Sequence, residues 1–231
     1  MHKKIISVFT FCILLPSNCA QNIDNNDKER YIEEIKNQMW DIFKNYGISK
    51  LPVPDYKQYY NQTEEFYGYK MVGCLYLNDG FVLDVLGFQV EPKPGPKVTL
   101  LTDRILISAV INVKNLQIFQ DFRIQFENLS DYQDKANGTI ITMPEGFSFE
   151  VKIFQKYPHM RMDSYVQEIR SIKPYFEFNP DNALTRRVRK KFQKHGVLED
   201  LCSEWKHIFS RILKEAVAKC KFPDVAFNIR N

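Results

Sequence analysis

The sequence predicts an α+β fold in which an antiparallel β-sheet lies between an N-terminal and a C-terminal amphipathic helix. Apolar residues recur at helical spacing over residues 32–46 and again over residues 184–216. Between residues 65 and 178 the apolar positions instead follow a period of two, which is the pattern of a β-strand. Strands with one dry face are typical of an antiparallel sheet packed on helices. The sheet and both helices are therefore expected to share one core.

The first helix is expected to begin near Asp27 and to end at Gly47, a residue that suits the position after a helix. Charged and polar residues take its outer side. Its apolar stripe consists of Ile32, Ile35, Met39, Ile42, Phe43 and Tyr46. The prolines at 52 and 54 then predict an extended connector over residues 51–54.

The alternation is clearest over residues 115–126, where Leu116, Ile118 and Phe122 share one face. Residues 147–155 repeat the pattern. Strands at residues 66–77, 81–90 and 98–113 are apolar on both faces. That part of the sheet is expected to be covered twice or to curl around something.

Turn residues divide this region. Asn78-Asp79-Gly80 predicts a hairpin. Residues 91–96 contain three prolines and one glycine, which favours an exposed loop. Met143-Pro144-Glu145-Gly146 predicts another turn.

The closing helical region is expected over residues 181–220, with Gly196 allowing a break or a kink. Its apolar stripe is wide and must be buried. The stripe consists of Leu198, Leu201, Trp205, Ile208, Phe209, Ile212, Leu213 and Ala216.

Residues 1–20 are identified as a secretory signal peptide, and residues 21–231 as a single domain. Lys3 and Lys4 precede a largely apolar run at residues 5–15, which is too short to cross a bilayer because a span needs about 20 residues. Cleavage after Ala20 removes two lysines and no acid, so the net charge falls from +4 to +2. A nearly neutral, secreted, extracellular protein is expected.

Three glycosylation sequons agree with export, and each is expected beside a strand, where a glycan faces water. They begin at Asn61, Asn128 and Asn137. Cleavage would leave the cysteines Cys74, Cys202 and Cys220, an odd number. Cys202 and Cys220 are about 27 Å apart on a continuous helix, too far for a disulfide. Either Cys74 pairs with one of them, or all three are buried thiols.

The sequence lacks the motifs of serine hydrolases, zinc proteases, phosphate-binding loops and dinucleotide-binding folds. His195, Glu199 and Cys202 share one helical face, and a metal or nucleophile site there is the alternative to a surface histidine beside a core cysteine. The latter interpretation is preferred. No enzyme activity, catalytic residue, metal or cofactor is expected.

A basic run is the strongest charge feature. It consists of Arg186, Arg187, Arg189, Lys190, Lys191 and Lys194. Val188 and Phe192 interleave with these cations, as on a helix that contacts anionic lipid headgroups or glycans. The alternative is a solvated helix face. Nucleic acid is not an expected partner, because the chain is exported and nearly neutral.

Several of these stretches together resemble the mite group-seven allergens and, at greater distance, the insect takeout and juvenile-hormone-binding proteins of the tubular lipid-binding superfamily. The resemblance covers about residues 28–222. It is carried by residues 31–47, the connector at 51–55, residues 68–77 and 83–88, and the closing helix at 198–220.

The resemblance implies a long curved antiparallel sheet wrapped around a long C-terminal helix, with an N-terminal helix and an apolar groove between them. In the relatives this groove takes lipids or other hydrophobic molecules. Takeout-type proteins carry a cysteine pair near the mature N-terminus, and here no cysteine occurs between Ala20 and Cys74. This departure favours the allergen-like branch. The family supplies no catalytic residues.

We therefore expect a secreted protein that binds a lipid or another apolar small molecule in this groove. The expected ligand contacts are Ile35, Met39, Ile42, Phe43, Leu75, Leu83, Ile118, Trp205, Phe209 and Ile212. The alternative is a secreted interaction module that contacts an anionic glycan, a membrane surface or a partner protein. Its contacts would come from the basic run at residues 186–194.

Overall fold

The computed structural model describes residues 20–22, 25–47, 50–63, 70–127, 135–156, 159–224 and 226–228. Nearly all of the predicted signal peptide lies outside these residues. The elements are β1 (Ala20–Asn22), α1 (Asn25–Tyr46), β2 (Tyr56–Thr63), β3 (Lys70–Asp84), β4 (Gly87–Val90), β5 (Lys97–Leu100), β6 (Arg104–Lys114), β7 (Gln117–Glu127), β8 (Lys135–Lys156), β9 (Arg161–Asn179), α2 (Ala183–Lys191), α3 (Lys194–Lys219) and β10 (Ala226–Asn228).

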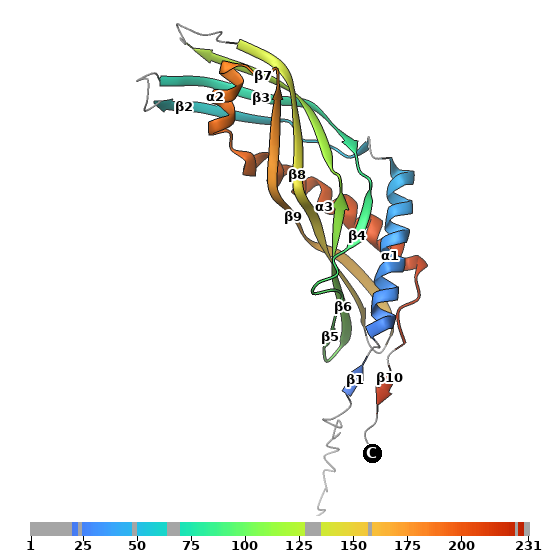
Figure 1. Ribbon diagram of the computed structural model, residues 1–231. Coiled ribbons are helices and arrows are strands. Elements are labelled where there is room, and N and C mark those ends of the chain that lie inside the picture. The colour runs from blue at the N-terminus through green and yellow to red at the C-terminus, as the bar shows by residue number, and fades with distance from the viewer. Residues whose placement is uncertain are drawn as a thin grey trace, which may run out of the picture.

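Eight antiparallel strands form one curled sheet, a half-barrel (Figure 1). The long strands β8 and β9 pair along the length of the molecule. The other edge of β8 pairs first with β7, which continues the sheet to β3 and β2, and then with β6. The sheet therefore has two ends, one built on β7 and one on β6.

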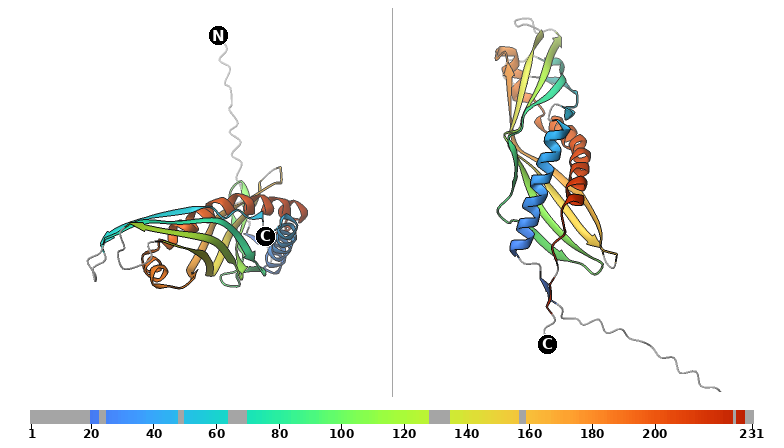
Figure 2. Two further views of the ribbon diagram at one scale, coloured as in Figure 1. Left: turned by 90° about the horizontal axis from the view of Figure 1, so that it is seen from above. Right: turned by 90° about the vertical axis from the view of Figure 1, so that its right-hand side faces the viewer.

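The helices cover one face of this sheet. Figure 2 shows α1 and α3 lying side by side across it, and α3 packs against β9. The short helix α2 lies at the end away from β1 and β10, which pair near the chain termini (Figure 1). The predicted α+β order of helix, antiparallel sheet and helix is confirmed. None of the helices in the described ranges is long and apolar enough to cross a membrane.

The predicted hairpin at Asn78-Asp79-Gly80 is wrong, because β3 runs through it with a β-bulge. Asp79 takes a positive φ of 52°, and the pairing with β7 shifts register between Asn78 and Phe81. The extended segment after α1 passes over β3 at this point, where Val53 pairs with Gly80. A Cβ on Gly80 would lie 2.4 Å from Val53 Cγ1, so the close approach requires glycine. The tripeptide thus bends a strand instead of ending one.

The predicted turn at residues 143–146 is also wrong, because β8 continues through Pro144. Pairing of β8 with β7 ends at Thr142, and pairing with β6 begins at Phe147. Pro144 falls in the gap between these partners, where its missing N–H breaks no ladder hydrogen bond. A proline at this place marks a change of partner strand.

Two other boundaries differ from the prediction. The sheet begins at Tyr56, earlier than predicted. The prediction missed β2 because its sequence is mostly polar. The closing helix breaks at Phe192 and Gln193, not at Gly196. Gly196 lies inside α3, where a Cβ would lie 2.8 Å from the Tyr56 hydroxyl oxygen.

The connector after α1 is extended, as predicted, and is held on both sides. Trp205 of α3 donates its indole N–H to the Pro52 carbonyl at 2.7 Å. Gln120 of β7 donates its amide to the Pro54 carbonyl at 3.1 Å. The end of α1 also matches the prediction, since Gly47 has a φ of 93° and donates its N–H to the Phe43 carbonyl.

Candidate functional site

The interior between the sheet and the helices has two parts. The α1 half is bounded by α1, β4, β6 and the C-terminal part of α3. The α2 half is bounded by α2, the start of α3 and strands β2, β3, β7, β8 and β9. Nine of the ten predicted ligand contacts lie in or at the edge of this interior, and the tenth, Leu83, lies outside it.

The α1 half is filled by the protein's own side chains. Ile35 and Met39 of α1 are fully buried. The Phe209 ring stacks 4.8 Å from that of Phe149 and 5.8 Å from that of Phe43, centroid to centroid. Side chains packed in this way fill the space between α1, α3 and the sheet. The predicted contacts in this half therefore form a core.

Leu83 is 51% exposed on the outer face of the sheet, so it does not lie with the other predicted contacts. The bulge after Asn78 moves the buried position from odd to even numbers, and Val82 takes the inner face in its place. Ile42 is half-buried at the edge of the α1 half.

A narrow cavity of about 10 Å³ lies in the α2 half. Its walls come from the connector, β7, β8 and α3. They are formed by Val53, Pro54, Ile118, Gln120, Thr142, Val197, Leu198 and Leu201. A cavity needs about 10–15 Å³ to hold one water molecule. This cavity is therefore just large enough for a single water molecule. Ile118 is the predicted ligand contact that lines it.

Two buried hydroxyls in the α2 half have no hydrogen-bond partner among the described residues. They belong to Thr142 of β8, which lines the cavity, and to Tyr60 of β2. A buried polar group without a partner costs about 1–3 kcal/mol. Burial also raises the pKa of Tyr60, so its hydroxyl stays protonated and can donate. The α2 half thus combines apolar walls with unused hydrogen-bonding groups.

The junction between α2 and α3 closes this half. Gln58 of β2 is buried and holds both sides of the junction, because its amide donates to the Lys191 carbonyl at 2.9 Å and accepts from the Gln193 N–H at 2.8 Å. The Phe192 ring lies edge-on to that of Phe176 at 4.9 Å. One side chain and one ring therefore fasten the junction to the sheet.

The sequence prediction missed both Gln58 and Thr142. A signal was present, because each is a polar residue at an inner-face position between apolar or aromatic neighbours two residues away. Polar residues on a dry face need a specific partner.

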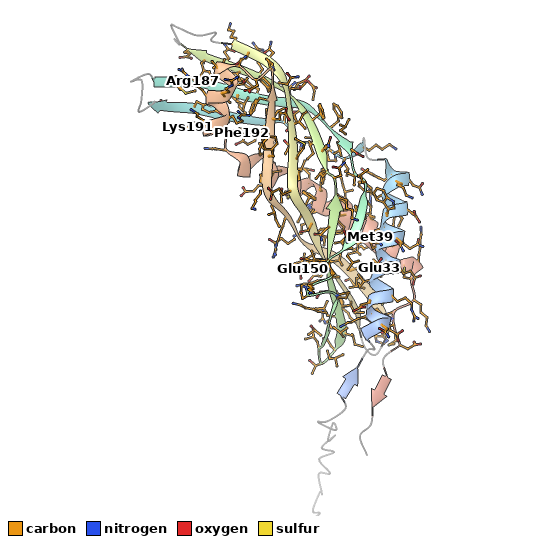
Figure 3. The ribbon with its side chains drawn as sticks, viewed as in Figure 1. Glu33, Met39, Glu150, Arg187, Lys191 and Phe192 are labelled. Carbon is orange, nitrogen blue, oxygen red and sulfur yellow. The ribbon has the colours of Figure 1, made fainter. Side chains whose placement is uncertain are left out.

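The predicted surface contacts Arg186, Arg187, Arg189, Lys190 and Lys191 all lie on α2, at the end of the molecule away from the termini (Figure 3). The helix contains no acid. Arg186 and Arg189 approach the same carboxylate, that of Asp181, at 3.1 Å and 4.0 Å. The apolar side of α2 packs inward through Leu184 and Val188. Excess positive charge therefore faces solvent.

The sequon asparagines Asn61 and Asn137 are exposed, but they lie within β2 and β8, not beside strands as predicted. Their inner-face neighbours, such as Tyr60 and Ile140, are buried. Both asparagines therefore point away from the helices. Asn128 lies outside the described residues.

The cysteines Cys74, Cys202 and Cys220 are half-buried free thiols, so no disulfide involves Cys74. Burial and the nearby Glu199 carboxylate raise the pKa of Cys202 to about 11. The thiol therefore stays protonated at neutral pH, which disfavours a metal or nucleophile role. The side chain of His195 lies outside the described residues.

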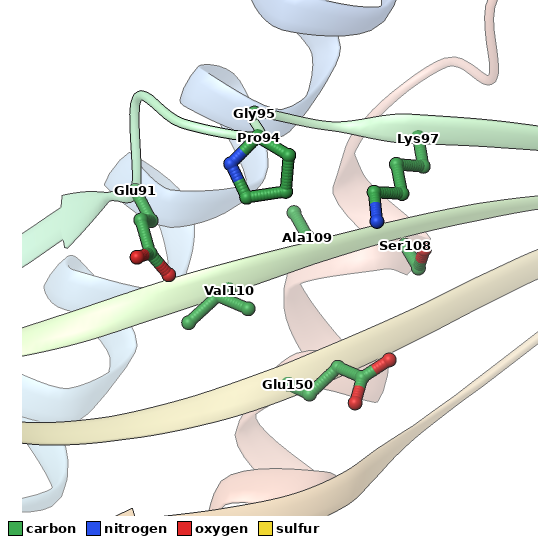
Figure 4. Close-up of a pocket in the computed structure, with 8 residues that line it drawn as sticks. All are labelled: Glu91, Pro94, Gly95, Lys97, Ser108, Ala109, Val110 and Glu150. Atoms are coloured by element: carbon green, nitrogen blue, oxygen red, sulfur yellow. The ribbon is translucent and has the colours of Figure 1, made fainter.

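A small pocket of about 70 Å³ lies on the other face of the sheet, under the loop at residues 91–96 (Figure 4). Glu91, Lys97 and Glu150 bring charged groups to it. The loop matches the prediction, although Pro96 is buried. Pro94, Ala109 and Val110 form its apolar walls, so the pocket is small and mixed in character.

Comparisons with known structures give only distant matches in fold. No protein-family model matches the chain, and no curated protein matches it. A crystal structure of lipopolysaccharide binding protein is similar with a TM-score of 0.42 and 11% sequence identity, over 84% of this chain and 36% of that chain. The chain thus spans about a third of the length of that protein.

Proposed function

We propose that this protein is a secreted, extracellular binding protein that holds a lipid or another apolar small molecule in the α2 half of its interior. The half-barrel covered by helices is compatible with binding an apolar ligand. One observation carries the proposal: the Thr142 hydroxyl is buried without a partner beside a cavity whose other walls are mainly apolar. A ligand with an apolar body and one polar end would satisfy this hydroxyl.

A ligand larger than water must displace α2 and the start of α3 from the sheet. This movement breaks the two hydrogen bonds of Gln58 and exposes the buried apolar residues Leu184, Val188 and Phe192. A ligand that buries roughly 300 Å² of apolar surface gains about 7 kcal/mol before entropy costs. This gain has to offset two hydrogen bonds of about 1 kcal/mol each, and the ligand has to cover the apolar surface that α2 uncovers.

The resemblance to mite group-seven allergens and takeout-type proteins supports the same function. The signal peptide and the sequons support export. Under this proposal the protein is a carrier or sensor, and it uses no catalytic residue or cofactor. Broad esterase activity in the purified protein would contradict that part of the proposal.

The variant Thr142→Val tests the site. It keeps the branched shape and removes the unpaired hydroxyl, so the free energy of unfolding should stay the same or rise by about 1 kcal/mol. Affinity for a fatty acid should fall about tenfold, since one hydrogen bond is lost. Titration with a fluorescent fatty acid and chemical denaturation measure the two quantities. The control is Thr99→Val, on the exposed strand β5. Equal affinities for wild type and Thr142→Val would place the ligand elsewhere.

A second function is supported by the charge of α2, and it is compatible with the first. We propose that the cations of α2 contact an anionic membrane surface while the buried apolar side of the helix stays packed on the sheet. The observation that favours it is the presence of five cations on nine residues, of which two approach a single carboxylate. Binding to heparin in place of vesicles would instead indicate a glycan partner.

A further inference from the structure

A broad hollow lies on the outer face of the sheet, over β2, β3 and β7. It is an open hollow of about 390 Å³. It is lined by Asp55, Tyr56, Lys57, Tyr76, Leu77, Asn78, Arg123 and Gln125. Apolar, cationic and amide groups and the carboxylate of Asp55 meet in it, which suits a ligand with both hydroxyl groups and C–H faces.

Lys57 of this hollow lies over two tyrosine rings, of which Tyr76 lines the hollow and Tyr59 lies outside its lining. Lys57 Nζ lies 4.8 Å from the ring centroid of Tyr76 and 4.4 Å from that of Tyr59. The Tyr59 side chain is 68% exposed. The ammonium group thus lies over each ring, and the Tyr76 side chain is half-buried.

The strand pairing places the hollow close to the glycosylation sequon at Asn137. Lys57 pairs with Tyr76, Tyr76 with Arg123, and Arg123 with Asn137. These four residues form one row across the outer face. Neighbouring strands lie about 4.8 Å apart, so the Asn137 backbone lies about 10 Å from that of Tyr76. A sugar ring is about as long as one strand spacing, so two linked rings cover this distance.

We propose that the hollow seats the N-linked sugars carried by Asn137 of the same chain. The first ring would lie over Arg123, and the second would place its C–H face on the Tyr76 ring. The amides of Asn78 and Gln125 offer hydrogen bonds to the sugar hydroxyls. The glycan then covers an aromatic surface and links β8, β7 and β3.

The covalent link follows from the sequon and rests on the export proposed above. In the secretory pathway, Asn137 Nδ2 bonds to the anomeric carbon of the sugar, the pyrophosphate carrier leaves, and the amide loses one proton. Asn61 is exposed on the same face, but it lies four residues along β2 from Lys57, about 14 Å away. Its sugars are therefore not expected to occupy the hollow.

The test is a double-mutant cycle in protein secreted by a glycosylating eukaryotic host. Asn137→Gln should lower the melting temperature by about 2–4 °C. In the Tyr76→Thr background, the same change should have almost no effect, because the stacking partner is absent. Peptide mapping should show a glycan at Asn137. An unmodified Asn137, or an equal shift in both backgrounds, overturns the proposal.

Two controls separate this result from other causes. Asn61→Gln should give the same shift with tyrosine or threonine at position 76. In unglycosylated protein from a bacterial host, Asn137→Gln should leave the melting temperature unchanged. Titration of the same variants with a fatty acid keeps the two proposals distinct. If no variant binds the fatty acid but the double-mutant cycle gives the expected shifts, only the proposed lipid-binding function is contradicted.

Discussion

Replacing Phe209 with alanine is expected to lower the free energy of unfolding by about 3–5 kcal/mol. The side chain is buried at the centre of the α1 half, where its ring stacks on Phe149 and Phe43. Both of these neighbours are also fully buried, so they have little freedom to fill the space that is left. Denaturation with guanidinium chloride, followed by circular dichroism, measures the change.

Phe81→Ala is the matched control, because Phe81 also stacks on a phenylalanine, Phe119, at 5.6 Å. It is 47% exposed on the outer face, so its loss should cost only about 1 kcal/mol. If Phe209→Ala costs no more than Phe81→Ala, the α1 half is not a packed core. The predicted open groove would then lie between α1 and α3.

Neutralising Arg189, Lys190 and Lys191 to glutamine is expected to weaken binding to anionic vesicles more than 100-fold. Each cation near such a surface contributes about 1 kcal/mol, and three contribute about 3 kcal/mol. Glutamine is used because a carboxylate at the end of a helix is unfavourable and would perturb α2 itself. Sedimentation with vesicles that contain phosphatidylserine measures the affinity, and added salt should weaken it in the same way.

The control removes three cations from the exposed side of α3, at Lys206, Lys214 and Lys219. It changes the net charge equally and leaves α2 intact. If both triple variants lose the same affinity, binding follows net charge alone. The assignment of the contact to α2 would then be wrong. Affinity for a fluorescent fatty acid should stay within about twofold in both variants.

Periodicity predicted the helices and most strands because burial of one face leaves a direct mark on the sequence. It failed where a single residue changes the backbone. Asp79, with its positive φ, shifts the register of β3 and turns Leu83 outward, and turn-forming residues cannot distinguish this bulge from a hairpin. Pro144 likewise gave a false turn, because the change of partner along β8 depends on strands that are distant in the sequence.

The candidate site was less predictable than the fold. An apolar residue that lines a groove and one that fills a core have the same sequence pattern, so Met39 and Phe209 were assigned to a groove although they pack as core. The residues that distinguish the α2 half are the polar ones, Gln58 and Thr142. Their roles depend on the α2–α3 junction and on the cavity, and both arise from packing between distant segments.

The most direct test of ligand binding in the α2 half uses the two tryptophans of the chain and a brominated fatty acid, which quenches an indole on contact. Trp205 lies one helical turn beyond Leu201, which lines the cavity, whereas Trp40 lies on α1. In Trp40→Phe protein, the fluorescence of Trp205 should fall saturably with ligand. In Trp205→Phe protein, that of Trp40 should change little. Quenching of Trp40 alone, or no saturable quenching of either indole, would contradict the account.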